Sequence, residues 1–315
     1  MSMSAGSERV FLCVSIDCEC DKGPAWKTRK PLSFAAITEG IGARLQPLFR
    51  RYHAKPTYLL SPEVMRDEAS VATLAAIENE CELGTHLHGE FVGPGAFEPE
   101  TTNAFQCHYD RVVEKEKLRE LTALFHAVFF RNPRSFRAGR FGIGTQSLGL
   151  LCDLGYAVDS SVTPSKDWTA AGAPEAAFRT APTQPYWPVL EKPAEVSPTP
   201  GRLWEVPVTI RPALLSWLPV VGPRLEPRWL RPTKGSITDL ELLAAEEIRA
   251  GAGKGRPIVL NCMFHNVEIM PGLSPYAATM GEADAILNRL GGLLAFAERS
   301  KIPIIGLGDV PALFC

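Results

Sequence analysis

Residues 9–21, RVFLCVSIDCECD, combine an unbroken apolar run with a cluster of acids at its end. A continuous apolar run of this length is typical of a strand buried on both faces of a parallel sheet, whereas a half-exposed strand alternates polar and apolar residues. The acids Asp17, Glu19 and Asp21 stand at the end of this run. The stretch predicts a buried strand that delivers carboxylates to one end of a sheet.

Seven further apolar runs resemble the first, and helix-like segments lie between them. The runs occupy residues 56–61, 81–88, 134–139, 156–161, 203–210, 257–265 and 302–308. Apolar residues at spacings of three and four, as in amphipathic helices, occur in segments 33–53, 110–129, 145–155, 236–251 and 281–299. Repeated strand–helix units predict an α/β fold with a parallel sheet, closed or nearly so at this length. Long loop insertions are expected near residues 89–109, 162–202 and 211–235.

Length and composition favour a single large domain. The chain has 315 residues, 45% of them hydrophobic, which is enough for a sizeable core. The net charge of −2 argues against a nucleic-acid partner. Residues 1–17 lack the regions of a signal peptide, and no stretch approaches the roughly 18 apolar residues of a membrane helix. We therefore expect a soluble cytoplasmic protein without a transmembrane segment, its eight cysteines being free thiols.

Ionisable residues stand at the ends of five of the predicted strands. In chain order these are Asp17 and Glu19, His86 and His88, Arg137 and Arg140, Asp159, and His265. The carboxyl ends of parallel strands meet at one mouth, where barrel enzymes place their sites. Histidines and carboxylates gathered there are the ligand types of a divalent metal. Structural interpretations remain open: the aspartates could cap turns or helices, and the histidines could be buried polar residues.

The motifs, taken in order, resemble those of the polysaccharide deacetylases, carbohydrate esterase family 4, particularly the branch of lipopolysaccharide and capsule biosynthesis. The resemblance covers roughly residues 9–310 and rests on Asp17-Cys18-Glu19, His86-Leu87-His88, FRAGRFG (136–142), GYAVDSS (155–161) and CMFHNVEIMPGLSPY (262–276). It implies a distorted (β/α) barrel of seven to eight mostly parallel strands, forming one domain over residues 9–315 behind a disordered N-terminus at residues 1–8. It also implies a metal-dependent hydrolase that removes acetyl groups from N-acetylated sugars or glycan precursors.

The resemblance assigns catalytic roles to four residues. Asp17 is expected as the general base, and Arg137 as the cation that keeps Asp17 charged. His265 is expected as the general acid, oriented and tuned by Asp159. In the mechanism that the resemblance implies, acid and base act from opposite sides of the mouth, which fits their distant positions in the sequence.

The expected metal ligands depart from the family pattern at one position. Glu19 and His86 occupy two ligand positions, but the family's second histidine, four positions after the first, is replaced here by Glu90. Three interpretations are open: His88 supplies the third ligand, Glu90 supplies it, or the site binds metal weakly or not at all. A catalytic zinc, the metal we expect, needs three protein ligands and one open position.

The same resemblance implies the substrate contacts. They are expected from Arg140, Phe141 and Asn266, with the backbone N–H near Phe141 helping to stabilise the oxyanion. Two alternative functions remain: hydrolysis of another C–N amide bond, such as that of a ureide, and a catalytically inactive, carbohydrate-binding role.

Overall fold

The computed structural model describes residues 9–95, 105–214, 216 and 225–314. Within these residues, eight strands form one parallel sheet in the order β11-β1-β2-β3-β4-β5-β8, with β12 also paired to β1. The strands are β1 (Val10–Cys18), β2 (Thr57–Leu60), β3 (Glu82–Leu87), β4 (Ser135–Ala138), β5 (Val158–Asp159), β8 (Trp204–Glu205), β11 (Ile258–His265) and β12 (Ile304–Ile305). Each of the eight predicted runs contains one of these strands, so the predicted fold class is confirmed.

The sheet curls toward closure between its two outer strands, β8 and β11. No strand ladder joins them in the described part of the chain. Instead, the buried side-chain amide of Asn261 on β11 donates to the carbonyl oxygens of Val206 and Pro207, just after β8. The Thr209 N–H also donates to the Asn261 carbonyl oxygen. These bonds give hydrogen-bond partners to backbone groups that would remain unpaired at an open sheet edge.

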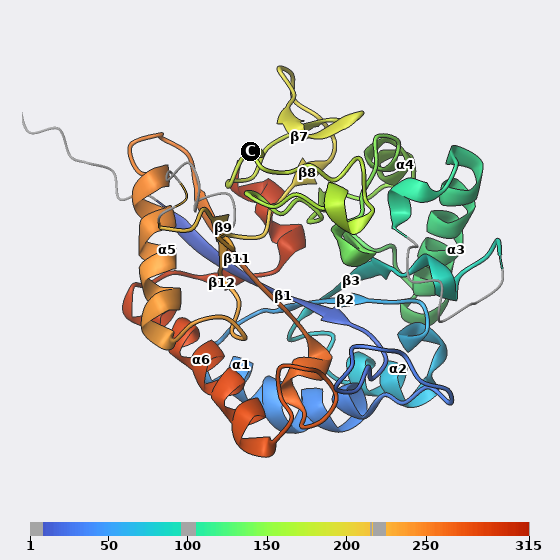
Figure 1. Cartoon of the computed structure of the whole chain (residues 1–315), viewed down its shortest axis with the longest axis horizontal. Coiled ribbons are helices and arrows are strands. Elements are labelled where there is room, and N and C mark those ends of the chain that lie inside the picture. Colours follow the sequence, from blue (N-terminus) through green and yellow to red (C-terminus); the bar gives the residue numbers. More distant parts are fainter. Residues whose placement is uncertain (1–8, 96–104, 215, 217–224, 315) are drawn as a thin grey trace, which may run out of the picture.

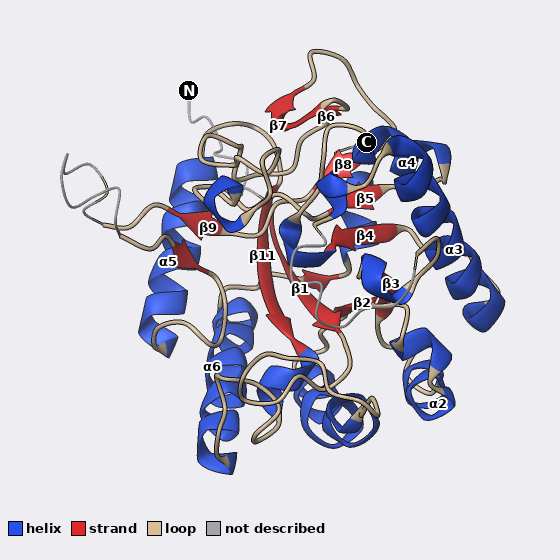
Figure 2. Ribbon diagram, turned by 45° about the vertical axis from the view of Figure 1, so that its right-hand side comes forward, coloured by secondary structure: helices blue, strands red, loops and turns tan. Residues whose placement is uncertain are grey.

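Helices cover the outside of this curled sheet (Figures 1 and 2). They are η1 (Ala36–Leu45), α1 (Gln46–Arg51), α2 (Glu68–Ala75), α3 (Arg111–Phe129), α4 (Ser147–Asp153), α5 (Ile237–Gly251) and α6 (Met280–Arg299). The longest helices begin at side-chain caps: the Asp110 carboxylate accepts from two backbone N–H groups of α3, and Ser236 and Thr279 form capping boxes. The main hydrophobic core lies between the sheet and these helices.

The predicted helix at residues 33–53 differs in detail from the one observed. Its first part, η1, is a π-helix that continues directly into α1, and Pro47 is the second residue of α1. Ser33, the first residue of the predicted helix, does not cap it. Asp21 accepts hydrogen bonds from the Ala35 and Ala36 N–H groups and from the Ser33 hydroxyl, and therefore caps the segment from outside it.

The three expected insertions lie partly within the described residues. Segment 162–202 contains a small antiparallel pair, β6 (Pro188–Val189) and β7 (Lys192–Val196). Segment 211–235 contributes β10 (Arg228–Trp229), which pairs with β9 (Ile210–Arg211). The expected disorder of residues 1–8, and parts of the insertions at 96–104 and 217–224, fall outside the described residues. Among those described, seven cysteines are free, and none of the helices is long and apolar enough to cross a membrane.

Candidate metal and catalytic site

Strand β1 places three polar side chains on the inner face of the curled sheet. Ser15, Asp17 and Glu19 alternate along the strand and just beyond its end, and all are buried. Asn266 fixes the backbone of Glu19: its side chain accepts from the Glu19 N–H at 3.0 Å and donates to the Glu19 carbonyl at 2.9 Å. Asn266 is itself fully buried, so it holds a site residue and does not supply the expected substrate contact.

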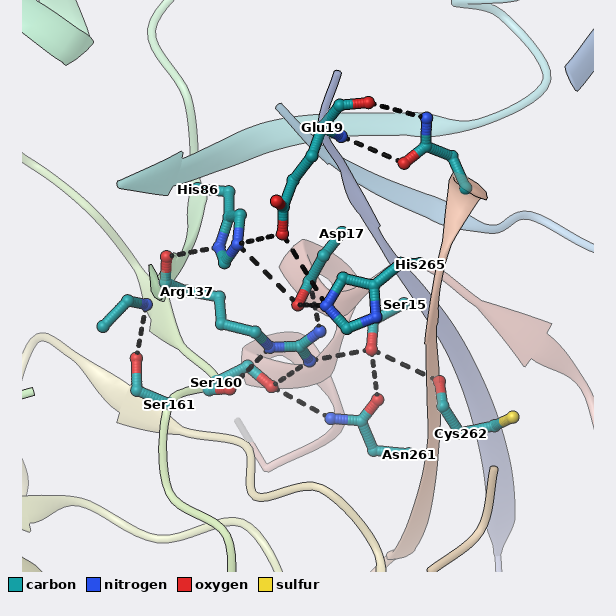
Figure 3. A network of polar contacts seen from close by, with 12 residues as sticks. Ser15, Asp17, Glu19, His86, Arg137, Ser160, Ser161, Asn261, Cys262 and His265 are labelled. Atoms are coloured by element: carbon teal, nitrogen blue, oxygen red, sulfur yellow. Dashed lines mark hydrogen bonds and ion pairs between the residues drawn. The ribbon is translucent and has the colours of Figure 1, made fainter. Parts of the chain in front are cut away.

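Asp17 is paired with Arg137, which reaches it from β4 (Figure 3). The Arg137 guanidinium donates to Asp17 Oδ1 at 2.7 Å and also binds the Ser15 and Ser160 hydroxyls and the Ser160 carbonyl. Burial raises the pKa of Asp17, but the charge of Arg137, with smaller contributions from His86 and His265, outweighs it and leaves the pKa below its ordinary value. The expected contact between the two residues is present, and Asp17 is held as a carboxylate.

His86 and His88 direct one ring nitrogen each toward the carboxylate of Glu19. The Nδ1 of His86 lies 3.0 Å from the Arg137 carbonyl oxygen, which can only accept, so Nδ1 carries the proton and Nε2 a lone pair. The Nε2 atoms of His86 and His88 lie 3.5 Å and 3.2 Å from Glu19 Oε1. Both nitrogens are buried and have no hydrogen-bond partner.

These three atoms fit the donor set of a divalent metal. Ligand atoms about 2.1 Å from a tetrahedral ion lie about 3.4 Å from one another, which matches the separations of Glu19 Oε1 from the two histidine nitrogens. Without such an ion, the carboxylates of Glu19 and Glu90 outweigh burial and raise the pKa of His88 to about 9. A positive charge between Glu19, His86 and His88 is therefore stabilised, and these three residues are the set that could hold a metal.

Glu90 lies behind His88 and outside this set. Its Oε1 accepts from His88 Nδ1 at 3.1 Å and from Arg140 at 3.0 Å. Although burial opposes ionisation, the charges of His88 and Arg140 hold the pKa of Glu90 far below its ordinary value. Of the alternatives left open by the sequence, the geometry favours His88 over Glu90 as the third ligand, with Glu90 orienting the ring as outer partners of metal-bound histidines do.

His265, at the end of β11, has different partners from those expected. Its Nδ1 lies 2.8 Å from Glu268 Oε1, and Arg231 also donates to Glu268. The expected pairing with Asp159 is therefore wrong. His265 Nε2 lies 3.8 Å from Asp17 Oδ2, because the two residues face each other on neighbouring strands. The expectation that acid and base lie on opposite sides is also wrong.

Asp159 instead forms a buried acid pair with Glu205 on the adjacent strand β8. The two residues are in register and have no exposed surface. Asp159 accepts from the Ser161 hydroxyl and Glu205 from the Val162 N–H, while each keeps one oxygen without a donor. Burial raises the pKa of both carboxyls, and the charge of Asp159 raises that of Glu205 further, so the pair shares a proton.

A cavity of about 730 Å³ opens over the candidate metal ligands, Asp17 and His265. Its volume is within the usual range of small-ligand sites. Its floor contains Asp17, Glu19, His86, His88 and His265, and its walls are largely aromatic, formed by Trp26, Phe91, Phe105, Phe141, Trp168 and Tyr276. Phe141 stacks on Trp168 with ring centroids 5.9 Å apart, and Trp26 packs edge-on against His265.

Backbone conformation is strained at three places in the cavity wall. Trp26, Arg140 and Phe141 have φ values of +54°, +57° and +56°, a region that residues with a Cβ seldom adopt. Arg140 and Phe141 both line the cavity, as substrate contacts would. Strain of this kind persists where the surrounding structure enforces it, and it is frequent at binding and catalytic sites.

Three charged residues that contact the acids or histidines of the site were missed from the sequence, as were several aromatic residues of the cavity wall. Glu268 follows His265 by three positions in a short helix, a spacing that the sequence could have indicated. Arg231 comes from the 211–235 insertion, and Lys22, which lines the cavity beside Glu19, comes from the loop after β1. Nothing in the local sequence places these two beside the site.

Comparisons with known proteins bear on the fold. No protein-family model and no curated protein matches the chain. A structure from Mycobacterium smegmatis described as a polysaccharide deacetylase matches 99% of this chain and 92% of its own at 14% identity (TM-score 0.54). One from Parabacteroides distasonis, described as a glycoside hydrolase/deacetylase, matches 97% and 71% at 11% identity (TM-score 0.68). The Puue allantoinase matches 98% and 91% at 13% identity (TM-score 0.57). The chain therefore has the distorted parallel barrel of polysaccharide deacetylase-like proteins.

Proposed function

We propose that the protein is a metal-dependent hydrolase that removes an N-acetyl group from a sugar or glycan precursor. The observation that carries the proposal is the convergence of three potential metal ligands, an ionised Asp17 and His265 on the floor of one aromatic-walled cavity. Solved proteins of the same fold include two that are described as polysaccharide deacetylases, which supports this reaction class. A cytoplasmic location would make a biosynthetic intermediate, such as a lipopolysaccharide or capsule precursor, the natural substrate.

Glu19, His86 and His88 would hold the metal, for which zinc suits the mixed nitrogen and oxygen ligands. A divalent ion bound there supplies Lewis-acid polarisation of the acetyl carbonyl and eases ionisation of a nearby water molecule. The chain fixes its ligands beforehand: Asn266 clamps the Glu19 backbone, and hydrogen bonds at Nδ1 set the tautomers of both histidines.

Asp17 would act as the general base. Its Oδ1 is bonded to Arg137, which leaves Oδ2 toward the cavity, 3.9 Å from His86 Nε2 and 3.8 Å from His265 Nε2. A carboxylate in this position can take a proton from an attacking water molecule. Arg137 keeps it ionised for that step, since the guanidinium stabilises the charged form.

His265 would protonate the leaving amine. Glu268 accepts at Nδ1 and so directs Nε2 into the cavity. Because His265 Nε2 and Asp17 Oδ2 are neighbours, the proton taken from water has only a short path to the histidine and then to the amine. The backbone N–H near Phe141 would help to bind the oxyanion, a contribution of about 3 kcal/mol per donor in comparable sites.

The cavity walls suit a sugar ring. The apolar faces of sugars pack on aromatic side chains, and Trp26, Tyr276, Phe141 and Trp168 supply such surfaces on the cavity wall. Arg140 adds a cationic donor at the rim, where it is one-third exposed. An N-acetylated monosaccharide or a short glycan end would fit a space of about 730 Å³.

Acetate release from N-acetylated sugars, measured with zinc-supplied protein, tests the proposal. Asp17→Asn and His265→Ala are each expected to lower the rate at least 100-fold, since a positioned acid or base contributes roughly 10²–10⁴-fold. The matched controls are Asp153→Asn and His126→Ala, which alter exposed residues on α4 and α3. The proposal fails if both site variants remain folded and active.

The substrate screen should also contain a cyclic ureide, because one protein of this fold is an allantoinase. If the protein hydrolyses the ureide and releases no acetate, the proposed roles of the residues stand. The substrate would then be another C–N amide and not an N-acetylated sugar. Tight binding of an acetylated sugar with neither metal nor turnover would indicate a catalytically inactive, carbohydrate-binding protein.

A further inference from the structure

The carboxylate of Glu19 is shared between two positive partners. Its Oε1 faces the Nε2 atoms of His86 and His88, at 3.5 Å and 3.2 Å. Its Oε2 lies 2.7 Å from the ammonium nitrogen of Lys22. One oxygen therefore points to the candidate metal position and the other is bound to a lysine.

Lys22 is held firmly in this position. The residue is only 6% exposed, and its ammonium also donates to the Thr28 hydroxyl at 3.1 Å. Asn266 binds both the N–H and the carbonyl oxygen of Glu19 and so fixes the backbone from which the carboxylate reaches Lys22. A buried ammonium that lost Glu19 would keep an uncompensated charge, so the pair persists as a unit.

The other carboxylates around the centre have fixed cations as well. The pairs are Asp17 with Arg137, Glu90 with Arg140, and Glu268 with Arg231. Four carboxylates thus face four permanent cations. The negative charge offered to a divalent ion is therefore much smaller than the number of acidic residues suggests.

We propose that Lys22 weakens divalent-metal binding at the Glu19–His86–His88 centre and makes it readily reversible. The ammonium leaves Glu19 one oxygen for coordination, withdraws charge from that carboxylate and repels the incoming ion. Metal occupancy then depends on the concentration of free ion. The inference rests on the metal centre of the proposed function but not on the reaction itself.

Metal titration of three proteins tests this inference. Wild type, Lys22→Met and Lys27→Met are stripped with a chelator and titrated with zinc chloride in a calorimeter. Methionine replaces the lysine stem without its charge. Lys27 lines the same cavity but is exposed, so its variant is the matched control for general electrostatics. Cobalt(II) absorption gives a second readout, because d–d intensity reports tetrahedral coordination.

Lys22→Met is expected to lower the Kd for zinc at least tenfold, with Lys27→Met within threefold of wild type. The inference is overturned if Lys22→Met binds zinc equally or more weakly, if both variants tighten binding alike, or if none of the proteins binds metal. If thermal melting shows that Lys22→Met is unfolded, Lys22→Gln is used in its place. No substrate is present, so a failed deacetylase assay and a failed titration remain distinguishable.

Discussion

Arg137 connects the fold to the candidate site, and replacing it with methionine should destabilise the protein strongly. The side chain is completely buried and its guanidinium makes four hydrogen bonds, to Asp17, to Ser15 and twice to Ser160. Methionine fills much of the same volume but supplies no donor. The Asp17 carboxylate, 2% exposed, would then be left in the interior without its cation.

The magnitude follows from these contacts. A hydrogen bond to a charged group contributes about 1.5–3 kcal/mol net, but burying the guanidinium is itself costly, so the four bonds do not simply add. Removing one partner of a buried ion pair costs about 3–5 kcal/mol, because the other charge remains uncompensated. We expect Arg137→Met to lower the free energy of unfolding by about that amount at neutral pH.

Guanidinium unfolding of wild type, Asp17→Asn, Arg137→Met and the double variant measures both the loss and its origin. If the uncompensated carboxylate dominates, the double variant should be at least 1 kcal/mol more stable than the sum of the single effects predicts. Arg119→Met is the control, since Arg119 is exposed and its ion pair with Glu116 contributes roughly 0–1 kcal/mol. Additive effects, or a loss no larger than that of the control, would refute the reasoning.

Two further predictions concern the frame of the site. Burial and the charge of Asp159 raise the pKa of Glu205 well above its ordinary value. The folded state therefore binds the Glu205 proton more tightly than the unfolded state does. Stability then falls as the pH rises from the ordinary pKa of a glutamate toward the raised pKa of the folded state. Glu205→Gln should therefore flatten the fall in the free energy of unfolding as the pH rises above about 4.3, the ordinary pKa of a glutamate carboxyl, as measured by denaturant titration; an unchanged profile contradicts the raised pKa. Gly84→Ala should cost about 1–3 kcal/mol in thermal or denaturant unfolding, because its Cβ would lie 2.6 Å from the Ser135 carbonyl oxygen; Gly149→Ala, in open space, is the control, and equal losses would contradict it.

The sequence predicted the sheet well because its strands are buried on both faces. Such strands appear as continuous apolar runs, and ionisable residues mark the carboxyl ends of five of the eight. Asp17, His86, Arg137 and His265 were assigned to one mouth on this basis, and they lie together. Strand periodicity also explains why Glu19, two residues after Asp17, shares its face.

The partners of these residues were harder to predict, because they depend on loops and on register between distant strands. Lys22 and Arg231 reach the cavity from irregular segments whose course no periodicity encodes. Asp159 illustrates the role of register: β5 pairs with β8, which places Glu205 opposite Asp159, whereas His265 bonds to Glu268. The local motif correctly placed Asp159 at the end of a strand, but it could not determine which residue lies next to Asp159.

The three cavity histidines share one hydrogen-bonding arrangement that a purely structural role does not explain. Each has an oxygen acceptor at Nδ1: the Arg137 carbonyl for His86, Glu90 for His88 and Glu268 for His265. The Nδ1 atom of each ring therefore carries a proton, and all three Nε2 atoms converge on Glu19 Oε1, at 3.5, 3.2 and 3.7 Å. A buried histidine that only supports the fold would be expected to have both nitrogens satisfied by hydrogen bonds. Here three Nε2 atoms are preoriented toward one carboxylate oxygen. A cation held by Glu19, His86 and His88 would account for the first two rings, and the proton that His265 is proposed to give to the leaving amine would account for the third.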